Sequence, residues 1–264
     1  MKAARLPLPD VPYAVYYLPE TDSTNTRMKQ WLRGEAPEGA EGENAVDACL
    51  AAGEQTLGRG RLGRRFLSPR GGLYFSLCLR ADSPAEAMGI TAPAAAAVCV
   101  ALEDLGFEDV LIKWVNDVYY RGKKVCGILC EYAEGAVVCG IGINLTSPEG
   151  GWPPEAGPAG ALDRPDMGRM TVLGAVLRRT DMFLRDRAAA LEFDRARQYL
   201  KGREVTVSLG GEEIRGTAED VDEEFRLVLS SGDGTVRLLN CGEVIRVRTD
   251  GQRNGSENED GGAV

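Results

Sequence analysis

The sequence predicts an α+β protein in two parts, a larger part of mixed strands and helices followed by a small β-barrel. Strand-like and helix-like segments are mixed between residues 13 and 200, and three strand-like segments in a row suggest an antiparallel meander. Beyond Gly202, five short alternating segments are separated by tight turns. We therefore divide the chain into an N-terminal extension (1–12), the larger part (13–200), the barrel (201–248) and a tail (249–264).

In the first half of the larger part, β-propensity, cap residues and apolar spacing mark each element. Pro19 ends the first strand, and the hydroxyl and carboxylate side chains at residues 21–23 are good helix N-caps. Gly34 is a natural stop for the helix that follows. In chain order we expect a strand at 13–18, a helix from 21–23 to 34, strands at 45–54 and 73–79, and a buried alanine-rich helix at 88–105.

The second half begins with the meander and ends with helices. Its strands are expected at 110–114, 124–132 and 136–145. Tight turns at 120–123 and at Glu134-Gly135 separate them. Five prolines and five glycines predict a loop over 148–170, and apolar spacing predicts one or two helices over 170–200.

Short alternating segments predict the barrel, and an acidic, glycine-rich composition predicts a disordered tail at 249–264. The barrel strands are expected at 205–209, 214–218, 225–229, 235–239 and 244–247.

Composition excludes several kinds of chemistry. The 264 residues include no histidine, which removes Ser-His and Cys-His nucleophile pairs and histidine zinc sites. The net charge of −9 argues against general binding of DNA or of an anionic membrane. Seven cysteines, without C-x-x-C spacing and mostly with apolar neighbours, indicate structural thiols in a reducing compartment. The longest uncharged run, which contains residues 89–102, is too short to cross a bilayer, and we expect a cytoplasmic protein.

An arginine-rich loop is the first candidate for chemistry. Residues 58–65 contain four arginines and three glycines. Glycines allow close backbone approach, and guanidinium groups offer forked donors to phosphate or carboxylate oxygens. Taken alone, this segment is equally well explained as a solvated basic loop or as an RNA-contacting segment.

Three further segments carry polar groups at defined points of the predicted fold. Thr21-Asp-Ser-Thr-Asn25 stands at a helix start, Lys113-Trp-Val-Asn-Asp117 follows an apolar strand with Lys124 across the next turn, and Gly140-Ile-Gly-Ile-Asn144 places two glycines in a strand. Each has an ordinary explanation: a helix cap, a hairpin with exposed polar residues, and a bulge.

The order of these four segments resembles the biotin–protein ligases, also called biotin–[acetyl-CoA-carboxylase] ligases. The resemblance covers residues 13–200, and residues 201–248 match the SH3-like C-terminal domain of that family. It implies a mixed-sheet catalytic domain of the class II synthetase and biotin–lipoate ligase type. Because only 12 residues precede Tyr13, we expect the monofunctional type, without a DNA-binding domain.

The resemblance implies a two-step reaction. Biotin would react with ATP, assisted by Mg²⁺, to give biotinyl-5′-AMP and pyrophosphate. A lysine of a biotin carboxyl carrier protein, from acetyl-CoA carboxylase or a related carboxylase, would then accept the biotin. Since the first step brings two anions together, cationic side chains must neutralise them. Family members often pair through the catalytic sheet, which leaves a homodimer open.

By similarity, the site residues fall into three groups. The catalytic residues are Lys124, Arg59 and Asp117. The biotin-binding residues are Ser23, Thr24, Asn25, Gln55, Arg59, Gly60, Arg61, Lys124 and Gly127. The ATP-binding residues are Arg61, Arg64, Phe66, Lys113, Asn116 and Asn144. No residue is assigned as a definite metal ligand, and Asp117 is expected either near Mg²⁺ or beside the incoming lysine.

Two positions depart from the family pattern. Val115 stands where many members have proline, and Phe66 stands where some have a tryptophan over the adenine. Phenylalanine can still stack there, with less area.

The alternatives are a lipoate or octanoate ligase of the same fold and, in a different class, a non-catalytic binding protein. A transferase of the lipoate type would use a cysteine thiolate, and Cys126 lies two residues from Lys124. Its apolar neighbours favour a place in the core.

Overall fold

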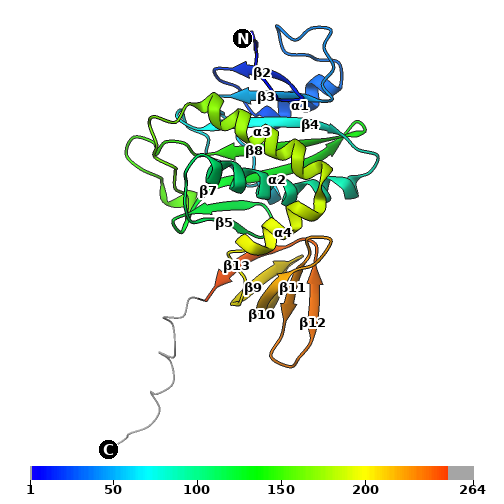
Figure 1. The fold of residues 1–264 in the computed structure, drawn as a ribbon, viewed down its shortest axis with the longest axis vertical. Helices are drawn as coiled ribbons and strands as arrows, with labels where there is room; N and C mark the ends of the chain where they lie inside the picture. The colour runs from blue at the N-terminus through cyan, green and yellow to red at the C-terminus, as the bar shows by residue number, and fades with distance from the viewer. Residues whose placement is uncertain (1, 249–264) are drawn as a thin grey trace, which may run out of the picture. The chain divides into compact units, whose positions relative to one another are not determined.

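The structure, a computed structural model, describes residues 2–248 and divides into two compact units between Tyr199 and Leu200 (Figure 1). The sequence placed this boundary after residue 200. Residues 249–264, for which we predicted a disordered tail, lie outside the described residues.

The first unit is built on an eight-stranded mixed sheet. Its strands follow the order β1-β2-β3-β4-β8-β7-β6-β5. The β2–β3 pair is parallel and the other neighbouring pairs are antiparallel. The strands are β1 (Ala4–Leu6), β2 (Ala14–Leu18), β3 (Ala48–Ala52), β4 (Leu73–Arg80), β5 (Val110–Lys113), β6 (Asp117–Tyr120), β7 (Lys123–Ala133) and β8 (Ala136–Ile143). The predicted mixed sheet and α+β class are therefore confirmed.

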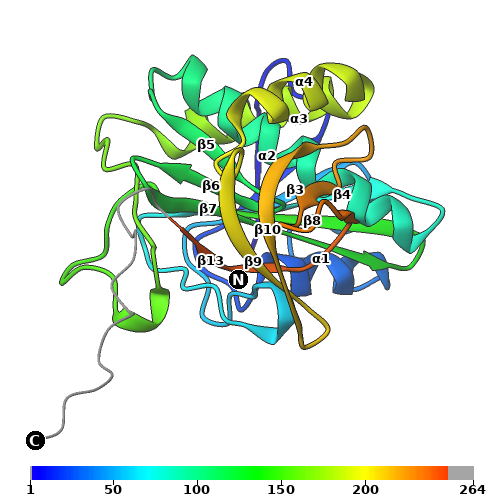
Figure 2. The same cartoon turned by 90° about the horizontal axis from the view of Figure 1, so that it is seen from below.

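Helices cover both faces of this sheet. Figure 2 shows α1 (Thr24–Leu32) on one face and α2 (Pro84–Asp104), α3 (Arg169–Arg185) and α4 (Arg187–Arg197) on the other. Two short 3₁₀ turns, Arg61–Gly63 and Pro154–Ala156, lie in loops. Since side chains alternate along a strand, β4 directs Ser76 and Cys78 toward α1 and Leu77 toward the opposite face of the sheet.

Small and aromatic side chains form the two layers of the core. Under α1, Met28 and Trp31 pack on Tyr16, whose ring meets the Trp31 ring edge-on at 5.2 Å between centroids. On the other face, alanines at 94–97 are fully buried and let α2 lie close to the sheet. Helix α2 is long and apolar enough to span a membrane, but 67% of its most apolar stretch is buried inside the protein. This is the environment of a core helix.

Two strands differ from the sequence-based expectations, and the open choice between one and two helices over 170–200 is decided. A short edge strand, Ala4–Leu6, lies in the predicted N-terminal extension and pairs with β2. The meander has an additional strand, Asp117–Tyr120, between two predicted ones. The helical segment 170–200 is two helices, because Asp186 ends α3 and its side chain caps α4 by accepting from Ala189 N at 3.0 Å.

The second unit is a five-stranded antiparallel sheet of the expected SH3-like type, with strand order β12-β11-β10-β9-β13. Its core is formed by inward-facing side chains such as Val207 and Leu229, both fully buried. The strands are β9 (Arg203–Leu209), β10 (Glu212–Val221), β11 (Leu227–Ser230), β12 (Val236–Leu239) and β13 (Glu243–Val247).

Two methionines on helices of the first unit test the packing of the core. Met28 is completely buried, whereas Met88 is 48% exposed. We expect Met28→Ala to lower the free energy of unfolding by about 2–5 kcal/mol, because it removes apolar contacts and leaves a cavity. Met88→Ala is expected to change it by less than about 0.5 kcal/mol. Urea denaturation of both variants measures the difference, and equal losses would contradict this packing.

Candidate active site

The candidate site lies on the α1 face of the sheet, where β7 and β8 carry glycines. Cross-strand pairing aligns Lys113, Asp117, Gly127, Gly142 and Tyr74 in one row over β5, β6, β7, β8 and β4. Since directly opposed residues share a face, the two glycines leave a shallow trough between the Asp117 and Tyr74 side chains.

Phe66 lies in this trough. A Cβ atom on Gly142 would come within 2.5 Å of the Phe66 ring, and one on Gly127 would come within 2.9 Å. The ring also meets Tyr74 edge-on, at 6.4 Å between centroids. The predicted adenine-stacking residue is thus packed directly against the sheet, and the glycines provide room for an aromatic ring.

The arginine-rich loop that carries Phe66 folds back on itself. Phe66 N donates to Gly58 O at 2.9 Å, and Gly60 N donates to Arg64 O at 2.8 Å. The turn is completed by Leu62 at φ 55° and Gly63 at φ 73°, both in the left-handed region. The loop is therefore a small hairpin that presents its arginines in different directions.

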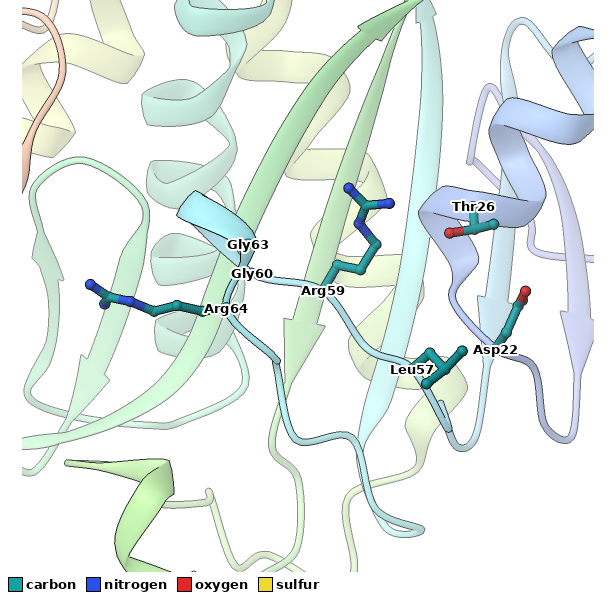
Figure 3. Close-up of a pocket in the computed structure, with 7 residues that line it drawn as sticks. All are labelled: Asp22, Thr26, Leu57, Arg59, Gly60, Gly63 and Arg64. Carbon is teal, nitrogen blue, oxygen red and sulfur yellow. The ribbon is translucent and has the colours of Figure 1, made fainter. Parts of the chain in front are cut away.

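A pocket of about 320 Å³ separates this hairpin from the start of α1 (Figure 3). In the figure, the Arg59 side chain points toward α1 and the strands, whereas Arg64 points to the opposite side of the hairpin. The lining residues are Asp22, Thr26, Leu57, Arg59, Gly60, Gly63 and Arg64.

The predicted hydroxyl and amide cluster is assembled at the N-terminus of α1. Ser23 is the N-cap, and its side chain accepts from Thr26 N at 3.5 Å. Thr24 N and Oγ1 both donate to Gln55 Oε1, at 2.8 and 3.2 Å. The structure therefore brings these three predicted biotin-binding residues together, although part of their hydrogen-bonding capacity is used within the protein.

Asn25 lies deeper, against the glycine strand β8. Its Oδ1 is 2.6 Å from Ser76 Oγ, and its Nδ2 donates to Glu131 Oε2 at 2.9 Å and to Leu129 O at 3.2 Å. A Cβ atom on Gly140 would overlap Asn25 Oδ1. Position 140 is thus suited only to glycine, because the Asn25 side chain occupies the space that a Cβ atom would need.

The cationic side chains at the Asp117 end of the trough each contact a polar partner. Lys124 Nζ lies 2.7 Å from Asp117 Oδ1, and both side chains are largely buried. Arg61 Nη1 donates to Asn116 Oδ1 at 2.8 Å, and Asn116 Nδ2 donates to Ile128 O at 3.2 Å. These four predicted residues form one neighbourhood beside the Phe66 ring, since Lys124 Cε and the ring both adjoin Gly127.

Two predicted ATP-binding residues lie at the margins. Lys113 Nζ sits 5.7 Å from the centroid of the Tyr119 ring, a cation–π geometry. Asn144 Nδ2 donates to Gly160 O at 2.9 Å, and Asn144 Oδ1 is buried without a hydrogen-bond partner among residues 2–248. A buried acceptor without a partner is costly, so this oxygen is suited to a donor on a bound ligand.

Cys126 belongs to the core, as expected. It is completely buried, and burial raises the pKa of its thiol far above the ordinary value despite the charge of Lys124. A reactive thiolate at this position is therefore disfavoured. All seven cysteines are free.

Sequence reasoning missed two residues of the site, Ser76 and Glu131. Ser76 is completely buried in β4, and Glu131 contacts Lys29, Asn25 and Arg59 at once. A hydroxyl within the apolar run of residues 73–79 was a detectable signal for Ser76. Glu131 gave no such signal, because charged residues near hairpin turns are common.

The site can neutralise an anionic ligand. It can hold a metal ion only if the ligand supplies further oxygen atoms to the metal. Cationic groups are present at Arg59, Arg61 and Lys124, while a cluster of three or more acidic or thiol side chains is absent from residues 2–248. Mg²⁺ commonly binds through one or two carboxylates plus substrate phosphates. Asp117 fits that pattern as a single carboxylate.

Comparisons with known proteins agree with this geometry. Residues 18–146 match the biotin/lipoate A/B protein ligase family, and residues 201–247 match the biotin protein ligase C-terminal domain. The biotin–[acetyl-CoA-carboxylase] ligase of Mycobacterium tuberculosis is 34% identical, with 87% of each chain covered. The bifunctional ligase/repressor BirA of Escherichia coli is 30% identical over 88% of this chain and 73% of its own length.

A solved structure shares both the sequence and the fold. The biotin protein ligase from Aquifex aeolicus, in complex with biotin and ATP, has a TM-score of 0.74 and 31% identity. The match covers 89% of this chain and 98% of that protein.

The contact between Gly140 and Asn25 can be tested through stability. We expect Gly140→Ala to lower the free energy of unfolding by about 1–3 kcal/mol, because the new methyl group overlaps a hydrogen-bonded amide. Gly60→Ala is the matched control, since its nearest neighbour would be an ordinary contact at 3.5 Å. Urea denaturation measures both, and an unchanged midpoint for Gly140→Ala would contradict the contact.

Proposed function

The chain belongs to the biotin/lipoate A/B protein ligase family, and from this we propose that it activates biotin with ATP to biotinyl-5′-AMP and transfers biotin to a carrier-protein lysine. The acceptor in this proposal is a biotin carboxyl carrier protein of acetyl-CoA carboxylase or a related carboxylase. The relative from Mycobacterium tuberculosis, which is named for acetyl-CoA carboxylase, supports that choice.

The observation that carries the proposal is the pairing of Lys124 with Asp117 beside the glycine trough. The two atoms are 2.7 Å apart, and the Lys124 side chain is 26% exposed. When a carboxylate attacks the α-phosphate of ATP, two anionic groups meet and negative charge develops on the leaving pyrophosphate. A partly desolvated ammonium stabilises such charge strongly. We assign Lys124, with Arg59, to the biotin carboxylate and the α-phosphate. Asp117 holds Lys124 in place before the anions arrive.

The polar cluster at α1 suits the ureido ring of biotin. This ring has two N–H donors and one carbonyl acceptor, and all three need partners when buried. Thr24, Asn25 and Gln55 provide hydroxyl and amide groups within one buried region, joined by Ser76. The apolar dithiolane ring of lipoate could not use the hydrogen-bonding capacity that these groups have left, so the cluster favours biotin.

The trough between Asp117 and Tyr74 suits the rest of the ligand. Phe66 now fills it, so a ligand that reaches Gly127 and Gly142 must displace the ring. We propose that the hairpin then closes over the adenylate and that Phe66 stacks on it. Closure would shield the reactive mixed anhydride from water.

The nucleotide contacts are assigned to two asparagines. Asn144 Oδ1, buried and without a partner in the described part of the chain, is suited to accept a hydrogen bond from the adenine amino group. Asn116 lies beside Arg61 and is suited to a second contact. Mg²⁺, with Asp117 as the available carboxylate, would add positive charge at the phosphates.

Biotin-dependent exchange of pyrophosphate into ATP tests the proposal. We expect exchange with biotin, little with lipoate, and a loss of about 10²-fold or more in Lys124→Ala, because a cation that faces the reacting anions is removed. Lys123→Ala is the matched control, since Lys123 is the neighbouring residue on β7 and is exposed. Exchange with lipoate alone would overturn the substrate assignment, and full exchange by Lys124→Ala would overturn the role of Lys124.

Limited proteolysis tests closure of the arginine hairpin. We expect trypsin to cut at Arg61, Arg64 or Arg65 in the ligand-free protein. Biotin plus ATP should slow these cuts at least about tenfold, because the closed hairpin is less accessible. Mass spectrometry of the fragments over time gives the rates, and identical rates with and without ligands would contradict closure.

A further inference from the structure

Glu131, on β7, links the amide cluster to the arginine hairpin. Its Oε1 accepts from Lys29 Nζ at 2.8 Å and lies 3.3 Å from Arg59 Nη2. Its Oε2 accepts from Asn25 Nδ2 at 2.9 Å. One carboxylate therefore contacts two residues assigned above to biotin, and neither the sequence resemblance nor the comparisons give it a role.

The hydrogen bonds of Asn25 show what Glu131 does to that residue. Both Nδ2 protons are used, one by Glu131 and the other by Leu129 O at 3.2 Å. Oδ1 accepts from Ser76 Oγ and, as a carbonyl oxygen, carries a second lone pair. Asn25 can therefore offer a ligand an acceptor but no donor.

We propose that Glu131 is a positioning residue that fixes the orientation of the Asn25 amide, so that its carbonyl oxygen is presented to an N–H of the biotin ureido ring. This inference rests on the proposed function. It deepens that function by naming the residue that makes the site select a substrate with an N–H donor at this position.

The electrostatics of a flipped amide support the inference. A flip of Asn25 would place its oxygen against two acceptors, the Glu131 carboxylate and the Leu129 carbonyl, and would turn Nδ2 toward Ser76. Such acceptor–acceptor contacts in a buried region are strongly unfavourable. A neutral glutamine at position 131 could instead donate to the flipped oxygen, so it would no longer enforce one orientation.

Glu131 is held in its ionised form. Burial alone would raise its pKa, but hydrogen bonds from Lys29 and Asn25, together with the charges of Lys29 and Arg59, lower the pKa below the ordinary glutamate value. Lys29 is 18% exposed and remains as a counter-ion, whereas Arg59 is 51% exposed and makes the longer contact. Arg59 can therefore move to a bound anion while Lys29 keeps Glu131 neutralised.

Calorimetric titration with biotin tests the proposal on the full chain. We expect Glu131→Gln to raise the Kd for biotin about tenfold, the effect of losing one well-placed hydrogen bond in a buried site. The same rise is expected with biotinamide, which keeps the ureido ring but lacks the carboxylate. Arg59 is assigned to that carboxylate, so an equal rise shows that the loss of affinity does not depend on Arg59. A change within twofold for both ligands would overturn the proposal.

Glu134→Gln is the matched control. Glu134 is also an acidic residue near the β7–β8 turn and also pairs with an arginine near α1, since Arg33 Nε lies 3.1 Å from its Oε1. It is exposed and has no assigned role. We expect its Kd for biotin to equal that of the wild type, and a loss as large as that of Glu131→Gln would overturn the proposal.

A polarity swap distinguishes positioning from simple stabilisation. Asn25→Asp alone places two carboxylates in contact, so we expect its Kd to rise more than tenfold. In the double variant Asn25→Asp with Glu131→Gln, the glutamine amide donates to the new carboxylate, which still presents an oxygen to the ligand. We expect this double variant to recover at least about fivefold in affinity over Asn25→Asp. Additive losses would overturn the proposal.

The wild type separates this inference from the proposed function. If the wild type binds biotin and Glu131→Gln binds it equally well, only the role of Glu131 is wrong. If the wild type does not bind biotin, both the role of Glu131 and the proposed function are wrong. Unfolding midpoints of the variants, measured in parallel, confirm that the affinities refer to folded protein.

Discussion

The contact between the first turn of α1 and the glycine strands is the constraint on which the site depends. Asn25 lies so close to β8 that position 140 has no room for a side chain, and its amide is then buried. A buried amide must be fully hydrogen-bonded, so Ser76, Leu129 and Glu131 are required around it. The Asn25 amide therefore connects α1 with β4, β7 and β8.

The cationic groups beside this surface are each paired with a carboxylate or amide of the protein when no ligand is bound. Lys124 pairs with Asp117, Arg61 with the Asn116 amide, and Arg59 with Glu131. Unpaired charges in a partly buried region would be costly, and these partners lower that cost. A bound anion would therefore replace the protein partner of a cationic side chain. The side chain would then lose little further hydration when the anion binds.

Most helices and strands were predicted correctly from local sequence patterns. The features that the sequence missed or left open each have a physical reason. The edge strand Ala4–Leu6 is only three residues long and is followed by prolines, so it resembled a loop. The choice between one and two helices over 170–200 was left open by the sequence, and the cap at Asp186 decides it. The hydroxyl of Ser76 in an apolar strand is visible in the sequence, but its partners Thr24 and Asn25 are not.

The sequence by itself determined the order of most elements, the four polar segments and the residue types that they offer. Periodicity, caps and turn residues act over a few positions and are visible in the chain. Only the tertiary structure decided which polar groups meet across the sheet, such as Glu131 with Asn25, 106 residues apart. It also decided that Phe66 lies on Gly127 and Gly142, because close packing depends on strand register and side-chain contact.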